Sequence, residues 1–174
     1  MKNTVTGEIT KTDYDELILS PGAKSIMPQS IKGIDKKNVC SVRNVVDIKN
    51  IQKYLTDNKV KSVAVIGGGF IGLEVCGNLV QSGKKVSLIE ANSHVLGTID
   101  DDFAQIVQKN LYDNGVDLHL EDSLIEIFDD HIRLHSGIEI KANAVIMAIG
   151  VSPETELAEK IGCKLGVTGA IAVN

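Results

Sequence analysis

The feature that most constrains this chain is the stretch VAVIGGGFIGLEVCGNLV at residues 63–80. It carries consecutive glycines at Gly67, Gly68 and Gly69, and a further glycine at Gly72. A glycine inside a strand or helix gives up side-chain packing and has more backbone entropy to lose on folding, so stability alone does not favour such a run. We therefore expect a tight turn at which the backbone comes close to another group.

Short apolar strands alternate with amphipathic helices on both sides of this turn. The expected strands span residues 62–66, 85–89, 116–120 and 144–149, and the expected helices span residues 46–57, 70–82 and 101–114. This alternation predicts βαβ units and a parallel sheet with covered faces. The expected fold class is therefore a Rossmann-like α/β domain.

Three shorter apolar segments precede the last of these strands, at residues 123–128, 131–135 and 138–141. Asp-Asp and Ser-Gly turn signals separate them. Short runs divided by such turns predict a β-meander.

The two ends of the chain carry weaker patterns. Residues 16–20 predict a short strand stopped by a Pro-Gly pair, and residues 21–42 predict a connector with little periodicity. A short helix is expected at residues 155–161 and a last strand at residues 170–173.

Gly67, Gly69 and Gly72 form a G-x-G-x-x-G pattern that follows an expected strand and opens an expected helix, and Glu90 ends the next strand. This order is the fingerprint of dinucleotide binding. The first glycine permits the tight turn, the second lets the backbone approach a pyrophosphate, and the third lets the helix pack on the strand. The helix N-terminus then offers free N–H groups and a partial positive charge to the phosphates. The alternative is a glycine-rich turn without a ligand.

Glu90 is placed to accept hydrogen bonds from an adenosine ribose. A 2′-phosphate in that position meets a like charge, with a repulsion of about 4 kcal/mol at about 4 Å and an effective dielectric of about 20. No Lys or Arg occurs between Val86 and Gln108 to offset it. The sequence thus predicts NAD(H) as cofactor, with NADH preferred over NADPH; the alternative for Glu90 is a solvated acid at a strand end.

The composition excludes several classes of function. The formal net charge is −5, and the chain has no Trp, three Phe and three Tyr, so it lacks the basic stripe and stacking aromatics of a nucleic-acid surface. The N-terminus has no signal-peptide layout, and no stretch approaches the roughly 18 apolar residues of a membrane span. We expect a cytoplasmic protein with no nucleic-acid or membrane partner.

The cysteines and histidines predict no metal site. Cys40, Cys76 and Cys163 are widely spaced, without a C-x-x-C pair, and are expected to be buried small hydrophobic residues. His131 and His135 are four residues apart in an expected strand, where side chains at that spacing lie too far apart for ordinary joint ligation.

Four motifs occur in a characteristic order, namely SPGA at 20–23, VRN at 42–44, GGGFIGLE at 67–74 and AIGVSPETELA at 148–158. With them the chain resembles the FAD-dependent pyridine nucleotide-disulfide oxidoreductases, in the branch of NADH oxidase, NADH peroxidase and coenzyme A disulfide reductase. The resemblance runs through nearly the whole chain.

The resemblance implies a domain order. Residues 1–38 would be the tail of the first half of a flavin domain plus a connector, residues 39–154 the NAD-binding Rossmann-like domain, and residues 155–174 the return segment toward the flavin domain. It also implies FAD as a second cofactor and a homodimer for the full-length protein.

The same resemblance implies two sets of cofactor contacts. The NADH contacts would be Gly67, Gly69, Phe70, Ile71, Gly72, Glu74, Glu90 and Gly150. The FAD contacts would be Ser20, Pro21, Gly22, Ala23 and Arg43. Phe70 matches an aromatic position that covers the nicotinamide pocket, with Glu74 close to it. Placed in the first helical turn, Glu74 has an alternative role in stabilising the helix through its dipole.

Some of the family's parts do not occur in residues 1–174. Pro153 is followed by Glu154, where the family commonly has Asn. The N-terminal flavin glycine motif, the catalytic cysteine, the later Gly-Asp flavin motif and the C-terminal dimerisation domain are absent from the sequence. We therefore expect no catalytic residue in this chain and no activity from the chain alone.

The expected function is that of the NADH-binding domain of a flavin-dependent oxidoreductase with a small-molecule substrate. The sequence leaves the final acceptor open among a coenzyme A disulfide, a peroxide, oxygen and a polysulfide. Two alternatives also stay open. One is a free-standing NAD-binding sensor, and the other is the NAD domain of a ferredoxin-reductase or nitrite-reductase type flavoprotein.

Overall fold

The computed structural model describes residues 1–173. These residues form two compact units, a larger one of residues 23–152 and a smaller one of residues 1–22 with residues 153–173. The domain boundaries implied by the resemblance, after residues 38 and 154, stay predictions; by their contacts, residues 23–38 group with the larger unit.

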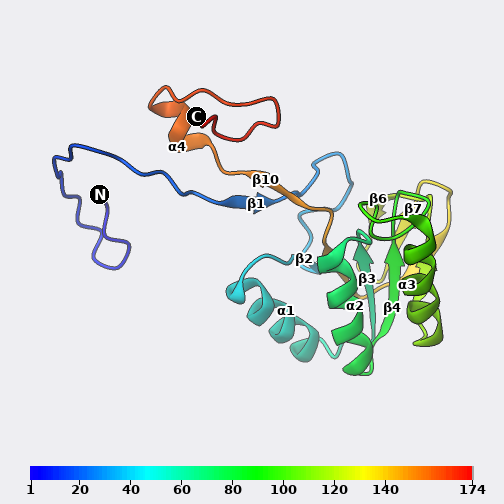
Figure 1. The fold of residues 1–174 in the computed structure, drawn as a ribbon. Coiled ribbons are helices and arrows are strands. Elements are labelled where there is room, and N and C mark those ends of the chain that lie inside the picture. The colour runs from blue at the N-terminus through cyan, green and yellow to red at the C-terminus, as the bar shows by residue number, and fades with distance from the viewer. Residues whose placement is uncertain (174) are drawn as a thin grey trace. The chain divides into compact units, whose positions relative to one another are not determined.

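The larger unit is built on a parallel sheet of strand order β2-β9-β3-β4-β5. Figure 1 labels its strands β2, β3 and β4. Its strands are β2 (Val39–Ser41), β9 (Ala144–Met147), β3 (Ser62–Ile66), β4 (Lys85–Ile89) and β5 (Asp117–His119). In the central register Val63 lies opposite Val86 of β4 and Ala144 of β9. The expected α/β fold with a parallel sheet is confirmed.

Helices cover one face of this sheet. They are α1 (Val45–Asp57), α2 (Phe70–Gln81) and α3 (Asp101–Asp113). Side chains alternate along β3, so Val63 and Val65 point into the core under the helices, where they meet Cys76 and Leu79 of α2 and Leu111 of α3.

The expected meander covers the other face. It comprises β6 (Leu124–Ile127), β7 (His131–Leu134) and β8 (Glu139–Lys141), paired antiparallel. Ile132 and Leu134 are fully buried and share a second core with Ala64 and Ile66 of β3. The carboxyl ends of the parallel strands are thereby held between two packed layers.

The expected strand at residues 16–20 is wrong. These residues are not in a strand, and Leu17 and Ile18 are exposed. The strand near this point is instead β1 (Ala23–Ser25), which pairs with β10 (Val151–Pro153). The expected connector therefore contains both β1 and β2, because three-residue strands are too short to show periodicity.

The smaller unit contains α4 (Glu156–Lys160), as expected. The last strand expected at 170–173 is wrong, since only an isolated bridge joins Leu165 and Ile171. Within residues 1–173, no helix has the length and apolar character needed to cross a bilayer.

Helix α1 begins with a capping box. The Asn44 side chain accepts hydrogen bonds from the backbone N–H groups of Val46 and Asp47 at 2.8 and 3.1 Å, and the Asp47 carboxylate accepts from the Asn44 N–H at 3.1 Å. The periodicity predicts a buried face of Val46, Ile48, Ile51 and Leu55. Ile51 and Leu55 are buried, but Val46 and Ile48 are exposed.

Replacing Asn44 with alanine should lower the free energy of unfolding by about 1 kcal/mol, because two N–H groups of the first turn lose their acceptor. Urea denaturation followed by far-UV circular dichroism measures the change. The matched control is Asn50→Ala, on an exposed position inside the same helix, which should be neutral or slightly stabilising. Equal losses for both variants would contradict a capping role.

Candidate dinucleotide-binding site

A cleft of about 700 Å³ lies at the carboxyl ends of the parallel strands in the larger unit. The glycine turn after β3, Glu90 after β4 and residues 148–150 after β9 all line it. In an open parallel sheet, this edge is where ligands bind. The topology thus brings together residues that are far apart in the sequence.

Two of the glycines are required for packing. Gly67 has φ +106°, and a Cβ there would lie 2.6 Å from the carbonyl oxygen of Ala148. A Cβ at Gly72 would lie 1.9 Å from the carbonyl oxygen of Gly67. Any side chain at these positions forces the turn and α2 away from the sheet.

Gly69 differs from both. Apart from Gly69, its two chain neighbours and the adjacent backbone of α2, no described atom lies within 4 Å of the position that its Cβ would occupy. Gly69 is the N-cap of α2, with no side chain to cap the helix. The absence of a side chain here leaves open space directly in front of the helix N-terminus.

The N-terminus of α2 supplies hydrogen-bond donors to that space. The first bond of the helix runs from the Leu73 N–H to the Gly69 carbonyl at 3.0 Å. The preceding N–H groups of the first turn have no intrahelical acceptor, and the helix dipole adds a partial positive charge. The free N–H donors, the positive potential of the helix dipole and the open space at Gly69 together fit a pyrophosphate.

Glu90 is half-buried and tied to the glycine turn. One of its carboxylate oxygens, Oε2, accepts from the Gly68 N–H at 2.6 Å. The other, Oε1, accepts from the Asn92 backbone N–H at 2.8 Å and from the Asn92 Nδ2 at 2.7 Å. The carboxylate is therefore oriented by the protein before any ligand arrives.

The loop after Glu90 also supports the turn. Leu96 has φ +53°, an uncommon conformation for a leucine, and its N–H donates to the Gly68 carbonyl at 2.9 Å. Val95 is buried, and its side chain would lie 3.0 Å from a Cβ on Gly68. Both polar groups of Gly68 are thus used within the protein.

The structure brings together most of the residues predicted to contact NADH. The cleft is lined by Gly67, Gly69, Phe70, Ile71, Glu90 and Gly150, and Gly72 packs behind the turn. Phe70 and Ile71 are 67% and 45% exposed, so their side chains are available to a ligand.

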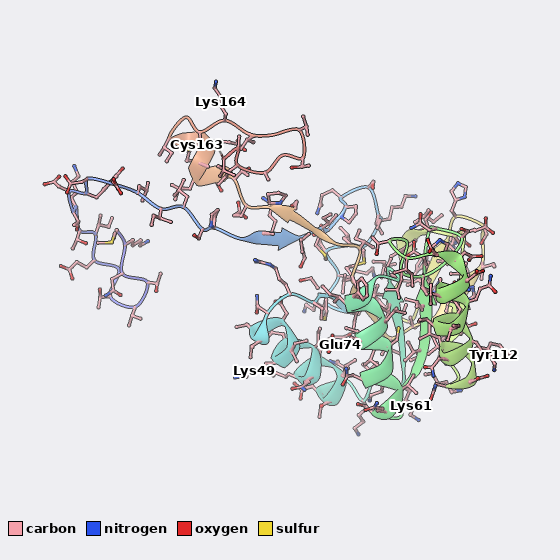
Figure 2. The ribbon with its side chains drawn as sticks, in the orientation of Figure 1. Lys49, Lys61, Glu74, Tyr112, Cys163 and Lys164 are labelled. Carbon is pink, nitrogen blue, oxygen red and sulfur yellow. The ribbon has the colours of Figure 1, made fainter. Side chains whose placement is uncertain are left out.

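Glu74 is not brought into this cleft. It lies in the second turn of α2 rather than the first, so the helix dipole does not account for it. Glu74 lines a separate groove of about 670 Å³ between α1 and α2 (Figure 2). Its contact with NADH stays a prediction.

The residues predicted to contact FAD are divided between the two units, and their contact with FAD stays a prediction. Ser20, Pro21 and Gly22 are exposed and belong to the smaller unit. Ala23 lies in β1 and Arg43 lines the groove between α1 and α2, both in the larger unit. Within residues 1–173, the turn at Gly67–Gly69 is the glycine-rich turn that joins a strand to a helix.

Asn92, Asp122 and Ser123 line the cleft but were missed from the sequence. Asp122 and Ser123 follow β5, and the rule that ligands bind at the carboxyl edge applies to that strand as well. Partial burial acts to raise the pKa of Asp122, but hydrogen bonds from the Ser136 hydroxyl and from neighbouring backbone N–H groups outweigh it and lower the pKa. Asp122 is thus a second anionic group at the cleft.

The cysteines are not placed for redox chemistry in the cleft, since none of them lines it. Cys76 is fully buried in the core, and burial raises the pKa of its thiol to about 12. Burial, with a smaller contribution from Asp47, also raises the pKa of Cys40. The expectation of buried cysteines is confirmed for Cys76, whereas Cys40 and Cys163 are only partly buried.

The sequence as a whole is matched by the model of a known family. Residues 1–174 match the model of the pyridine nucleotide-disulphide oxidoreductases. This chain belongs to that family. A curated relative, the NADH oxidase of Methanocaldococcus jannaschii, is 39% identical over 172 residues, which are 97% of this chain and 38% of the relative.

Solved structures agree with this assignment. The reduced CoADR-RHD protein of Bacillus anthracis is 41% identical with a TM-score of 0.95, over 99% of this chain and 31% of that one. The water-forming NADH oxidase of Lactobacillus brevis bound to NADH, at 28% identity, and its engineered NADPH-bound mutant, at 26%, both have TM-scores of 0.87 over 99% of this chain and 38% of theirs. The chain therefore spans well under half the length of these relatives.

Proposed function

We propose that this chain is the NADH-binding part of a flavin-dependent oxidoreductase. The observation that carries the proposal is the open space at Gly69, in front of the first N–H groups of α2 and beside the oriented carboxylate of Glu90. The pyrophosphate would lie against the helix N-terminus and the adenosine ribose against Glu90. Phe70 and Ile71 would lie on the nicotinamide side.

In the whole protein, FAD would accept hydride from the nicotinamide and pass the electrons to a disulfide, a peroxide or oxygen. The part of this chain is to bind NADH and to orient the nicotinamide. Support for a larger protein comes from the family match and from the smaller unit, whose apolar side chains Leu17, Ile18, Leu157 and Ile161 are exposed. Those side chains would pack against the rest of a flavin domain.

We further propose that NADH is preferred over NADPH. The charged residues that line the cleft are Glu90 and Asp122, and the described lining contains no Lys or Arg. A 2′-phosphate would add a negative charge beside Glu90 with no cation to offset it. Related structures of this fold hold either NADH or NADPH, so the fold alone does not set the preference.

Calorimetric titration of this chain should give a dissociation constant for NADPH at least about tenfold higher than for NADH, since a repulsion of about 4 kcal/mol at an effective dielectric of about 20 exceeds the roughly 1.4 kcal/mol that a tenfold ratio requires. Glu90→Gln should reduce the ratio to less than about threefold. Asp57→Asn, on an exposed position at the end of α1, changes the net charge equally and should leave the ratio unchanged. Equal affinities of the unaltered chain for both nucleotides would contradict the role of Glu90.

A further inference from the structure

The hydrogen bonds of Glu90 set a condition on how the ribose binds. An ionised carboxylate has about two acceptor positions on each oxygen. Both positions of Oε1 are taken, by the backbone N–H and the side-chain amide of Asn92, while among the described residues Oε2 accepts only from Gly68. As it stands, Glu90 has room for one ribose hydroxyl, whereas an adenosine ribose offers two neighbouring hydroxyls.

The donors on Glu90 differ in how easily they leave. The N–H groups of Gly68 and Asn92 are fixed by the backbone, and Gly68 is held further by the Leu96 N–H on its carbonyl. The Asn92 side chain is exposed, lines the cleft, and among the described residues its amide has Glu90 as its one hydrogen-bond partner. Rotation of this amide into water frees a position on Oε1 without any movement of the backbone.

We propose that the side-chain amide of Asn92 competes with the adenosine ribose for Glu90. In the free protein the amide satisfies the carboxylate; when the nucleotide binds, the amide leaves Oε1 and the second ribose hydroxyl takes its place. Asn92 is thus a positioning residue that lowers nucleotide affinity. This inference rests on the proposed function, because it takes the ligand to be a dinucleotide with its ribose at Glu90.

The test is nucleotide binding by Asn92→Ala. The backbone N–H of residue 92 is retained, so Glu90 stays oriented while the competing donor is removed. NADH should bind about three- to tenfold more tightly, in keeping with the loss of one partly exposed hydrogen bond to a charged group. The matched control is Ser93→Ala, on the next exposed residue of the loop and outside the cleft lining, which should leave the affinity unchanged.

Fragments of the nucleotide separate competition from a general change in the loop. The higher affinity of Asn92→Ala should appear with ADP, which carries both ribose hydroxyls. It should vanish with 2′-deoxy-ADP, which carries one. Nicotinamide mononucleotide, which has no adenosine ribose, should bind equally to both proteins. An unchanged or weaker affinity of a folded Asn92→Ala variant for NADH, or an equal gain with 2′-deoxy-ADP, overturns the inference alone. Failure of the unaltered protein to bind NADH or ADP overturns the proposed function along with it.

Discussion

Replacing Gly69 with valine should abolish measurable NADH binding and leave the fold intact. The valine side chain would fill the space in front of α2 where the pyrophosphate approaches the backbone. Because no described atom lies within 4 Å of the Cβ position, and the backbone φ of −75° suits any residue, the substitution itself causes no clash. Calorimetric titration with NADH measures the loss, and far-UV circular dichroism measures the fold.

The matched control is Gly77→Val, the same substitution in the same helix. Gly77 is exposed, and its Cβ position is also open, but it lies outside the cleft lining. This variant should bind NADH with the same affinity as the unaltered chain.

Gly72→Ala should instead lower the stability of the fold, because the new Cβ would collide with the Gly67 carbonyl. Unchanged NADH affinity of Gly69→Val would show that the turn has a purely structural role.

The central βαβ unit was predictable because its signals are local. The apolar strand β3, the glycine turn and α2 are contiguous, and each has a period or residue type that depends only on near neighbours. The position of Glu90 was predictable in the same way, because the acid ends the next strand after the glycine turn and its helix. The strand β2 was missed since its three residues become a strand only by pairing with β9, from the far end of the larger unit.

Exposure and hydrogen-bond partners were beyond the sequence pattern. The period of α1 identifies one apolar face, but only Ile51 and Leu55 on it are covered, because the start of the helix extends along an open groove beside α2. The spacing of Glu90 likewise indicates an acid near a ribose. The spacing gives no sign that the Asn92 amide already donates to one oxygen of Glu90, because that hydrogen bond depends on the path of the loop after β4.

The chain of residues 1–174 alone should neither retain FAD nor oxidise NADH. Hydride transfer requires the nicotinamide and the flavin ring to be held within about 3.5 Å, and a misplacement of about 1 Å costs roughly a hundredfold in rate. In the described residues the glycine-rich turn after β3 lines the cleft proposed for NADH, and Ser20, Pro21 and Gly22 are exposed. Incubation with FAD followed by gel filtration should give a colourless protein. NADH absorbance should stay constant with oxygen, peroxide or coenzyme A disulfide.

Two controls make this outcome informative. The same preparation must bind NADH by calorimetry, which shows that the cleft is folded and that the missing activity comes from the missing flavin site. The Methanocaldococcus jannaschii relative named NADH oxidase, of which the matched region is 38%, should oxidise NADH in the same assay. Stoichiometric FAD retained by residues 1–174, with turnover of NADH, would contradict the proposal and would require a second dinucleotide site within this chain.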